Sequence, residues 1–148
     1  MGDGAIGRPA RPDLAAMVVP LGRALVAAEL PVLRAHAVSM WAYAVLLHLD
    51  DEPTRSQAAL AQAIGADKTR IIAVLDELTE RGLIRRHPDP ADRRVRLLSI
   101  TAAGRRLRDT VQSAIQDQEE RLLAQVPTAD RRAFLRTLQL LTTLPQPD

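Results

Sequence analysis

The segment 83–101, with the sequence LIRRHPDPADRRVRLLSIT, limits most strongly what this chain can fold into. Residues 83–87 and 95–100 are too short to form helices and are rich in branched side chains, and two prolines lie in the loop between them. This pattern predicts a β-hairpin with Asp-Arg-Arg, residues 92–94, at the far end of its loop. A helix closed by Gly82 is expected directly before the hairpin.

The remaining chain has the pattern of helices. Alanine, leucine and arginine dominate, and only three residues are aromatic, which favours helix over sheet. Four residues can cap helices by accepting a backbone N–H bond: Ser39, Ser56, Asp67 and Thr101. Apolar residues at three- and four-residue spacing predict helices over six ranges: 14–32, 40–49, 57–64, 68–81, 102–126 and 128–144. Pro20 and Pro31 should kink or split the first of these.

These elements define the expected fold class, which is mainly α with a small β-hairpin. Helices 57–64 and 68–81, joined by a tight turn at Gly65, form a helix-turn-helix. The hairpin that follows gives this unit the layout of a winged helix-turn-helix. A helix that leads into an arginine-tipped hairpin is typical of DNA-binding lobes of that kind.

Charge is distributed unevenly along the chain. The formal net charge is only +2, but residues 81–108 hold nine arginines against two acids, a local charge of +7. The remaining residues therefore sum to −5. One basic face on a mildly acidic domain is expected of a protein that binds a polyanion, although a solvated arginine face gives the same count.

Several kinds of chemistry find no support in the residues present. The chain has no cysteine, which removes disulfides, thiolate nucleophiles and thiol-based redox sensing. Its histidines, His36, His48 and His87, fall on different predicted elements. The sequence has no glycine-rich phosphate loop and no histidine–carboxylate spacing typical of metal sites. We therefore expect no catalytic residues, no metal, no cofactor and no enzymatic activity.

The N-terminal region indicates neither a leader nor a membrane anchor. Residues 1–12 carry three glycines and two prolines and are predicted to form a loose arm. The apolar stretch 14–30 is interrupted by Pro20, Arg23 and Glu29. We therefore expect no membrane span and a cytoplasmic location.

The helix over 68–81 has the features of a DNA recognition helix. Such a helix points its N-terminus into the major groove and brings first-turn side chains to bases and phosphates. Here the first turn offers Lys68, Thr69 and Arg70. We expect Lys68 and Thr69 to contact phosphates and Arg70 to contact a base, because arginine can pair bidentately with guanine.

Further candidates lie before this helix and in the hairpin. Three residues are placed where the preceding helix would cross the sugar–phosphate backbone: Arg55, Ser56 and Gln57. At the hairpin tip, we expect either Arg93 or Arg94 to enter a narrow minor groove, where the potential is most negative. We expect the other arginine to pair with Asp89 or Asp92 and to hold the loop in shape.

Several short motifs lie in order along the middle of the chain. They are SQAALA at 56–61, LDEL at 75–78 with RGLI at 81–84, DPADRR at 89–94, and SIT at 99–101 with GR at 104–105. Together they resemble the MarR (multiple antibiotic resistance regulator) family of transcriptional regulators, from about Ser39 to Thr101. The motif at 89–94 is the most specific of them.

The resemblance implies a ligand-responsive repressor that acts as a homodimer on a pseudo-palindromic site in double-stranded DNA. It assigns residues 13–38 and 105–148 to interleaved dimerisation helices and residues 39–104 to DNA binding. Many members bind small phenolic or lipophilic ligands where these two parts meet. Four residues of this chain fall near that place: His36, Met40, Trp41 and Tyr43. Aromatic residues at helical spacing fit core packing as well.

The chain departs from the family in two respects. A Thr-Arg pair common in the recognition helix is replaced by Ile72 and Ala73, so we expect Arg70 to supply the missing arginine contact. The hydroperoxide sensing of some members requires a cysteine, which this chain lacks. A second hypothesis is a winged-helix module that binds an acidic protein partner through the same basic face.

Overall fold

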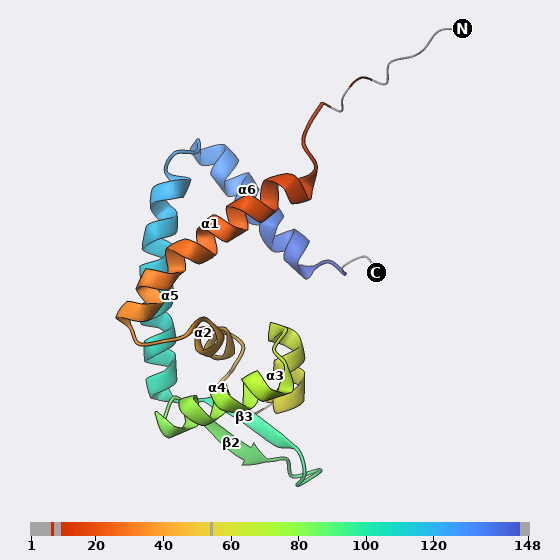
Figure 1. Ribbon diagram of the computed structural model, residues 1–148, viewed down its shortest axis with the longest axis vertical. Helices are drawn as coiled ribbons and strands as arrows, with labels where there is room; N and C mark the ends of the chain where they lie inside the picture. The colour runs from red at the N-terminus through yellow and green to blue at the C-terminus, as the bar shows by residue number, and fades with distance from the viewer. Residues whose placement is uncertain (1–6, 8–9, 54, 146–148) are drawn as a thin grey trace, which may run out of the picture.

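The computed structural model describes residues 7, 10–53 and 55–145. This part of the chain forms helices and one three-stranded antiparallel sheet (Figure 1). In chain order the elements are α1 (Leu14–Ala35), α2 (Met40–Leu47), β1 (Arg55–Ser56), α3 (Gln57–Ile64), α4 (Lys68–Glu80), β2 (Ile84–Pro88), β3 (Arg96–Ile100), α5 (Ala102–Leu123) and α6 (Thr128–Thr143). The predicted fold class is confirmed.

The molecule is divided into a lobe and a helical arm. Helices α2, α3 and α4 pack with the sheet at one end of the long helix α5, while α1 and α6 lie at its other end (Figure 1). The hairpin β2–β3, which we call the wing, projects from the lobe. Helix α5 therefore joins the wing-bearing lobe to the helical arm.

The predicted helix starts are confirmed by their hydrogen bonds. In each case the side-chain oxygen of the capping residue accepts a backbone N–H bond, at 3.1 Å for Ser39, 3.1 Å for Ser56, 2.8 Å for Asp67 and 3.1 Å for Thr101. The turns after α3 and α4 use glycines with positive φ, +67° at Gly65 and +69° at Gly82. These local signals fix where the helix-turn-helix begins and ends.

Helix α1 is one continuous helix, so the predicted split at Pro20 or Pro31 is wrong. Each proline removes one N–H donor from the helical hydrogen-bond ladder. Both prolines lie on the exposed surface, where water can solvate the carbonyl that loses its partner. The helix therefore continues through both positions.

The sheet contains one strand that the sequence did not reveal. Strand β3 lies in the centre, with β2 on one side and the two-residue strand β1 on the other. Arg55 of β1 pairs with Leu98, and β2 pairs with β3 from Ile84 opposite Ile100 onward. In β3 Leu98 is fully buried and its neighbour Leu97, on the other face, is half-buried, so both faces of this strand carry an apolar residue and the alternation is imperfect.

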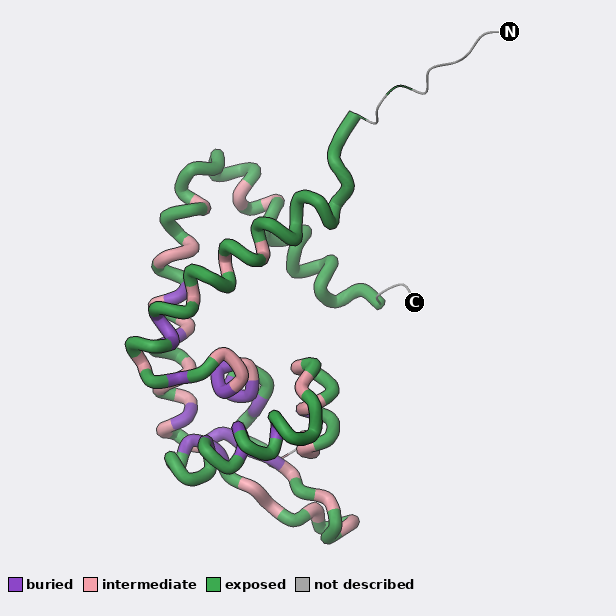
Figure 2. The backbone as a smooth tube through the Cα atoms, in the orientation of Figure 1, coloured by how far each residue is buried: buried purple, intermediate pink, exposed green. Residues whose placement is uncertain are grey.

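Burial is concentrated in the lobe and in the adjoining part of α5 (Figure 2). The core includes Leu46 of α2, Leu60 of α3, Leu75 of α4, Leu98 of β3 and Val111 of α5, all fully buried. This core fixes the recognition helix and the wing relative to α5. The predicted loose arm at 1–12 lies mostly outside the described residues.

Helices α1 and α6 expose most of their apolar residues (Figure 2). These exposed residues are Leu14, Met17, Val18, Val19, Leu21, Val26 and Leu30 on α1 and Phe134, Leu135, Leu138, Leu140 and Leu141 on α6. By length and composition α1 counts as a candidate membrane span, and core helices of soluble proteins meet the same criterion. Helix α1 buries Val32 and Leu33, and α6 buries none of its residues, so the exposed apolar side chains of both helices lack cover within one chain.

Candidate nucleic-acid interface

An open concavity lies between α3, the start of α4 and the wing. Its volume is about 560 Å³, and we call it the basic concavity. It is lined by Ser56, Gln57, Ala58, Ala61, Lys68, Ile71, Arg94, Val95 and Arg96. Four residues predicted to bind DNA therefore line one surface: Ser56, Gln57, Lys68 and Arg94.

Two helix N-termini border the basic concavity. Gln57 is the first residue of α3 and Lys68 the first of α4, and both line it. Free N–H groups and the helix dipole make each of these ends partly positive. Together with the cations Lys68, Arg94 and Arg96, they give a surface suited to phosphate.

Two aspartates of the wing loop, Asp89 and Asp92, accept hydrogen bonds within the loop. Asp92 accepts hydrogen bonds from the backbone N–H of Arg94 at 3.0 Å and from its Nε at 3.2 Å. The side-chain hydrogen bond from Arg94, and to a smaller extent the backbone one, lowers the pKa of Asp92. Asp89 accepts the N–H of Ala91 at 2.9 Å. The Arg94 side chain nevertheless stays 91% exposed.

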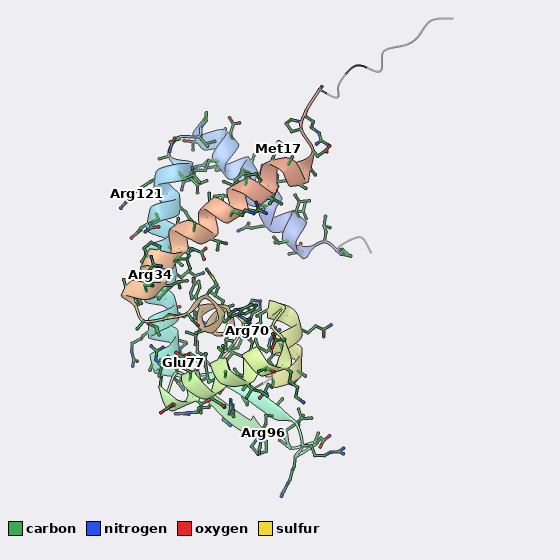
Figure 3. The ribbon with its side chains drawn as sticks, viewed as in Figure 1. Met17, Arg34, Arg70, Glu77, Arg96 and Arg121 are labelled. Atoms are coloured by element: carbon green, nitrogen blue, oxygen red, sulfur yellow. The ribbon has the colours of Figure 1, made fainter. Side chains whose placement is uncertain are left out.

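Arg70 lies on a different side of the recognition helix from the basic concavity. Its guanidinium carbon is 5.1 Å from the centre of the Trp41 ring, and its Nε is 3.8 Å from Asp67 Oδ2. Figure 3 shows Arg70 beside α2, whereas Arg96 lies on the wing. The residue predicted to contact a base is therefore engaged by a tryptophan, although its side chain is 52% exposed.

The other predicted contact residues surround the concavity without lining it. Thr69 and Arg93 are exposed, and Arg55 is half-buried in β1. Arg96, at the first position of β3, also lines the concavity and was not among the residues predicted from the sequence. The signal in the sequence that could have identified Arg96 is its position close to Arg93 and Arg94.

The wing is braced against the recognition helix. Arg86 of β2 donates from Nη2 to Asp76 of α4 at 2.6 Å. Within the wing, His87 Nε2 and Ser99 Oγ lie 3.0 Å apart and join β2 to β3. The orientation of the wing is therefore tied to that of α4.

The four predicted ligand-pocket residues differ in their surroundings. His36 lines an open depression between α1 and α5, and its Nδ1 is 2.8 Å from the Val32 carbonyl oxygen. Met40, Trp41 and Tyr43 do not line that depression. Tyr43 is a buried core residue, while Met40 and Trp41 are half-buried against the core.

Two carboxylates line a small cavity between α1 and α5. Glu29 and Glu119 share this space of about 230 Å³ with apolar neighbours such as Leu25 and Ile115. The pKa of Glu29 is raised mainly by burial and to a smaller extent by the negative charge of Glu119. Burial and both carboxylates also raise the pKa of Tyr43. The helical arm thus contains a pair of acids held close together.

The fold and the basic concavity define a winged-helix nucleic-acid-binding protein. No cluster of histidine, cysteine, aspartate or glutamate suited to a metal ion occurs in the described ranges. Residues 38–95 match the family model of the MarR family. The chain belongs to the MarR family of transcriptional regulators.

Comparison with individual proteins agrees with this family. A putative transcriptional regulatory protein for the hcr operon of Thauera aromatica is 30% identical, covering 91% of this chain and 89% of that protein. CouR from Rhodococcus jostii RHA1, solved with p-coumaroyl-CoA, is 28% identical with a TM-score of 0.71, over 92% of this chain and 96% of that one.

The transcriptional repressor CouR has also been solved on a 23-mer DNA duplex. That structure is 27% identical with a TM-score of 0.73, over 88% of this chain and 92% of that one. These relatives are regulators of transcription, so they favour a DNA-binding regulator over the module for an acidic protein partner.

Proposed function

We propose that this protein is a homodimeric, ligand-responsive transcriptional repressor that binds a pseudo-palindromic operator. The observation that carries the proposal is the basic concavity, where two helix N-termini and three cations from α4 and the wing share one surface. In this arrangement α4 enters the major groove and the wing reaches the adjacent minor groove. Residues 39–104 then form the DNA-binding region.

Contacts to the phosphates position the lobe on DNA. We assign this role to Arg55, Ser56 and Gln57 at the start of α3 and to Lys68 and Thr69 at the start of α4. Backbone N–H groups at helix N-termini and short polar side chains are common phosphate donors. Such contacts make affinity fall steeply as salt concentration rises.

In the wing, one arginine takes the two roles that the sequence analysis divided between Arg93 and Arg94: we assign the minor-groove contact to Arg94, which also pairs with Asp92, and a neighbouring phosphate contact to Arg93. Asp92 holds the Arg94 side chain at the tip while 91% of it stays exposed. An arginine already fixed in place loses less rotamer entropy when it binds. Asp92 and Asp89 are thus positioning residues for the wing.

Arg70 can still contact a base by leaving Trp41. A cation–π contact at an exposed site is worth about 0.5–1 kcal/mol. A bidentate arginine–guanine pair contributes about 1–3 kcal/mol of base discrimination. Exchanging the first for the second is therefore favourable, and it frees the Trp41 ring when DNA is bound.

The exposed apolar faces of α1 and α6 support a homodimer. Residues 13–38 and 105–148 supply these faces, which a second copy of the chain would cover. A symmetric dimer presents two lobes to two half-sites about one helical turn apart. A second chain over this face accounts for the apolar character of α1 without a membrane. It agrees with a cytoplasmic location.

We place the effector where the helical arm meets the lobe, near His36, Met40, Trp41 and Tyr43. CouR, solved with p-coumaroyl-CoA, supports a small phenolic or lipophilic ligand. A ligand in this place changes the separation of the two lobes and so weakens the fit to both half-sites. The ligand acts as an effector and not as a substrate, so we propose no enzymatic activity.

Selection of duplexes from a random pool by the purified protein, followed by band shifts, tests this function. We expect a pseudo-palindromic sequence bound much more tightly than random DNA at moderate salt. Equal binding of all sequences would contradict the regulator and favour the acidic-partner module.

The division of labour between α4 and the wing is tested on the selected duplex. Arg70→Ala should relax preference at one base position and cost about 1–3 kcal/mol there. Arg93→Ala combined with Arg94→Ala should weaken binding to all sequences alike. Arg11→Ala, before the start of α1, is the control for loss of one exposed cation. Uniform loss for both the α4 and the wing variants contradicts the assignment.

A further inference from the structure

We infer that Ile72 is a specificity residue that reads the methyl group of a thymine in the major groove. The inference rests on the proposed function, because it requires that α4 lies in that groove. Ile72 is an aliphatic residue on the exposed surface of α4.

Ile72 is set apart from the other large apolar residues of α4. Ile71, Val74, Leu75 and Leu78 form the buried face of the helix, with exposures between 0% and 9%. Ile72 is 38% exposed and belongs to the solvent side. Its next neighbour there, Ala73, is exposed as well. The second turn of α4 therefore presents an apolar surface to the outside.

The row of residues along the helix places this surface next to the basic concavity. Lys68 lies one turn before Ile72 on the same side and lines the concavity together with Arg94. Asp76 lies one turn after Ile72 and accepts a hydrogen bond from Arg86 of β2 at 2.6 Å. Ile72 thus lies between a cation suited to phosphate and the bond that braces the wing.

The charges along α4 limit the part of the helix that meets DNA. Its first turn carries Lys68 and Arg70, whereas Asp76, Glu77 and Glu80 follow in its second half. Acidic side chains repel phosphates, so contact is confined to the first two turns. Within these turns Ile72 is the large apolar side chain that is exposed.

The chemistry of the base edges then selects thymine. In the major groove adenine, guanine and cytosine present hydrogen-bonding groups, and thymine adds an apolar C5 methyl group. An isoleucine cannot satisfy a hydrogen-bonding edge but gains free energy by covering a methyl group. Each half-site should therefore contain a thymine opposite Ile72.

The test uses the selected duplex with individual thymines replaced by deoxyuridine. This replacement removes only the methyl group and leaves base pairing unchanged. Burial of one such group corresponds to about a fourfold change in affinity per half-site, and about 15-fold when both half-sites are changed. Deoxyuridine in the flanking DNA is the control.

The wild type should lose this affinity at one thymine position in each half-site, and Ile72→Ala should bind both duplexes equally. Ile72→Val should keep part of the discrimination. A melting curve checks that each variant is folded, as expected for a residue outside the core.

The inference would be overturned, with DNA binding intact, if deoxyuridine did not change the affinity of the wild type. The same holds if Ile72→Ala lost as much affinity as the wild type. Half-sites without thymine at the position of α4 would overturn it too. Failure to select any sequence would overturn the proposed function and this inference with it.

Discussion

Replacing Gly104 by alanine is expected to destabilise the junction between the lobe and α5. Gly104 lies in the first turn of α5, directly against the turn that connects α4 to β2. An added Cβ would overlap the Leu83 carbonyl oxygen and lie 2.8 Å from Ile100 Cγ1. The first obstacle is backbone, which cannot rotate away as a flexible side chain can.

The cost follows from what must move to relieve this overlap. The start of α5 is held here by a bond from the Thr101 N–H to the Leu83 carbonyl at 3.0 Å and one from Thr101 Oγ1 to the Gly82 carbonyl at 2.7 Å. Overpacking costs about 1–3 kcal/mol, and each strained hydrogen bond about 0.5–1.5 kcal/mol. We expect a loss of about 2–4 kcal/mol, which lowers Tm by about 5–15 °C.

Thermal unfolding followed by circular dichroism measures this loss. Protein concentration is held fixed, because the apparent stability of a dimer depends on it. Ala102→Ser is the matched control, since it adds one atom to an exposed residue of the same turn. Its Tm should stay within about 2 °C of the wild type. A Gly104→Ala variant as stable as this control would show that a Cβ at this position does not strain the contact with the Leu83 carbonyl.

Two further predictions concern the helical arm. Leu138→Arg with Leu141→Arg places two charges on the apolar face of α6 and should yield monomers that bind DNA poorly; a dimer by light scattering would show that this face is not the interface. Glu29→Gln should stabilise the protein at pH 7 and leave it unchanged at pH 4, as measured by urea unfolding. The raised pKa of Glu29 means that folding favours its protonated form, so the wild type loses stability as pH rises above 4.5, and an equal gain at both pH values contradicts this.

The helix starts could be predicted because a cap is a local event. Ser39, Ser56, Asp67 and Thr101 each accept a bond from a residue three positions later, so a short stretch of sequence contains both partners. The wing could be predicted for the same reason, since its strands are close in sequence.

The features that could not be predicted depend on distant parts of the chain. Strand β1 forms because Arg55 pairs with Leu98, and nothing near Arg55 signals a partner 43 residues away. The stacking of Arg70 on Trp41 is likewise a tertiary contact, which moves the predicted base-reading side chain away from the basic concavity. Propensity rules also overstated the effect of Pro20, because they do not include its exposure.

Fluorescence anisotropy with the selected duplex and a shuffled duplex, titrated at low and moderate salt, measures whether the protein reads a DNA sequence. We expect the selected duplex to bind at least about 1,000-fold more tightly and both affinities to fall steeply with salt. We also expect two chains per selected duplex. Equal affinity for both duplexes at moderate salt would contradict the claim that the basic concavity and α4 read a DNA sequence.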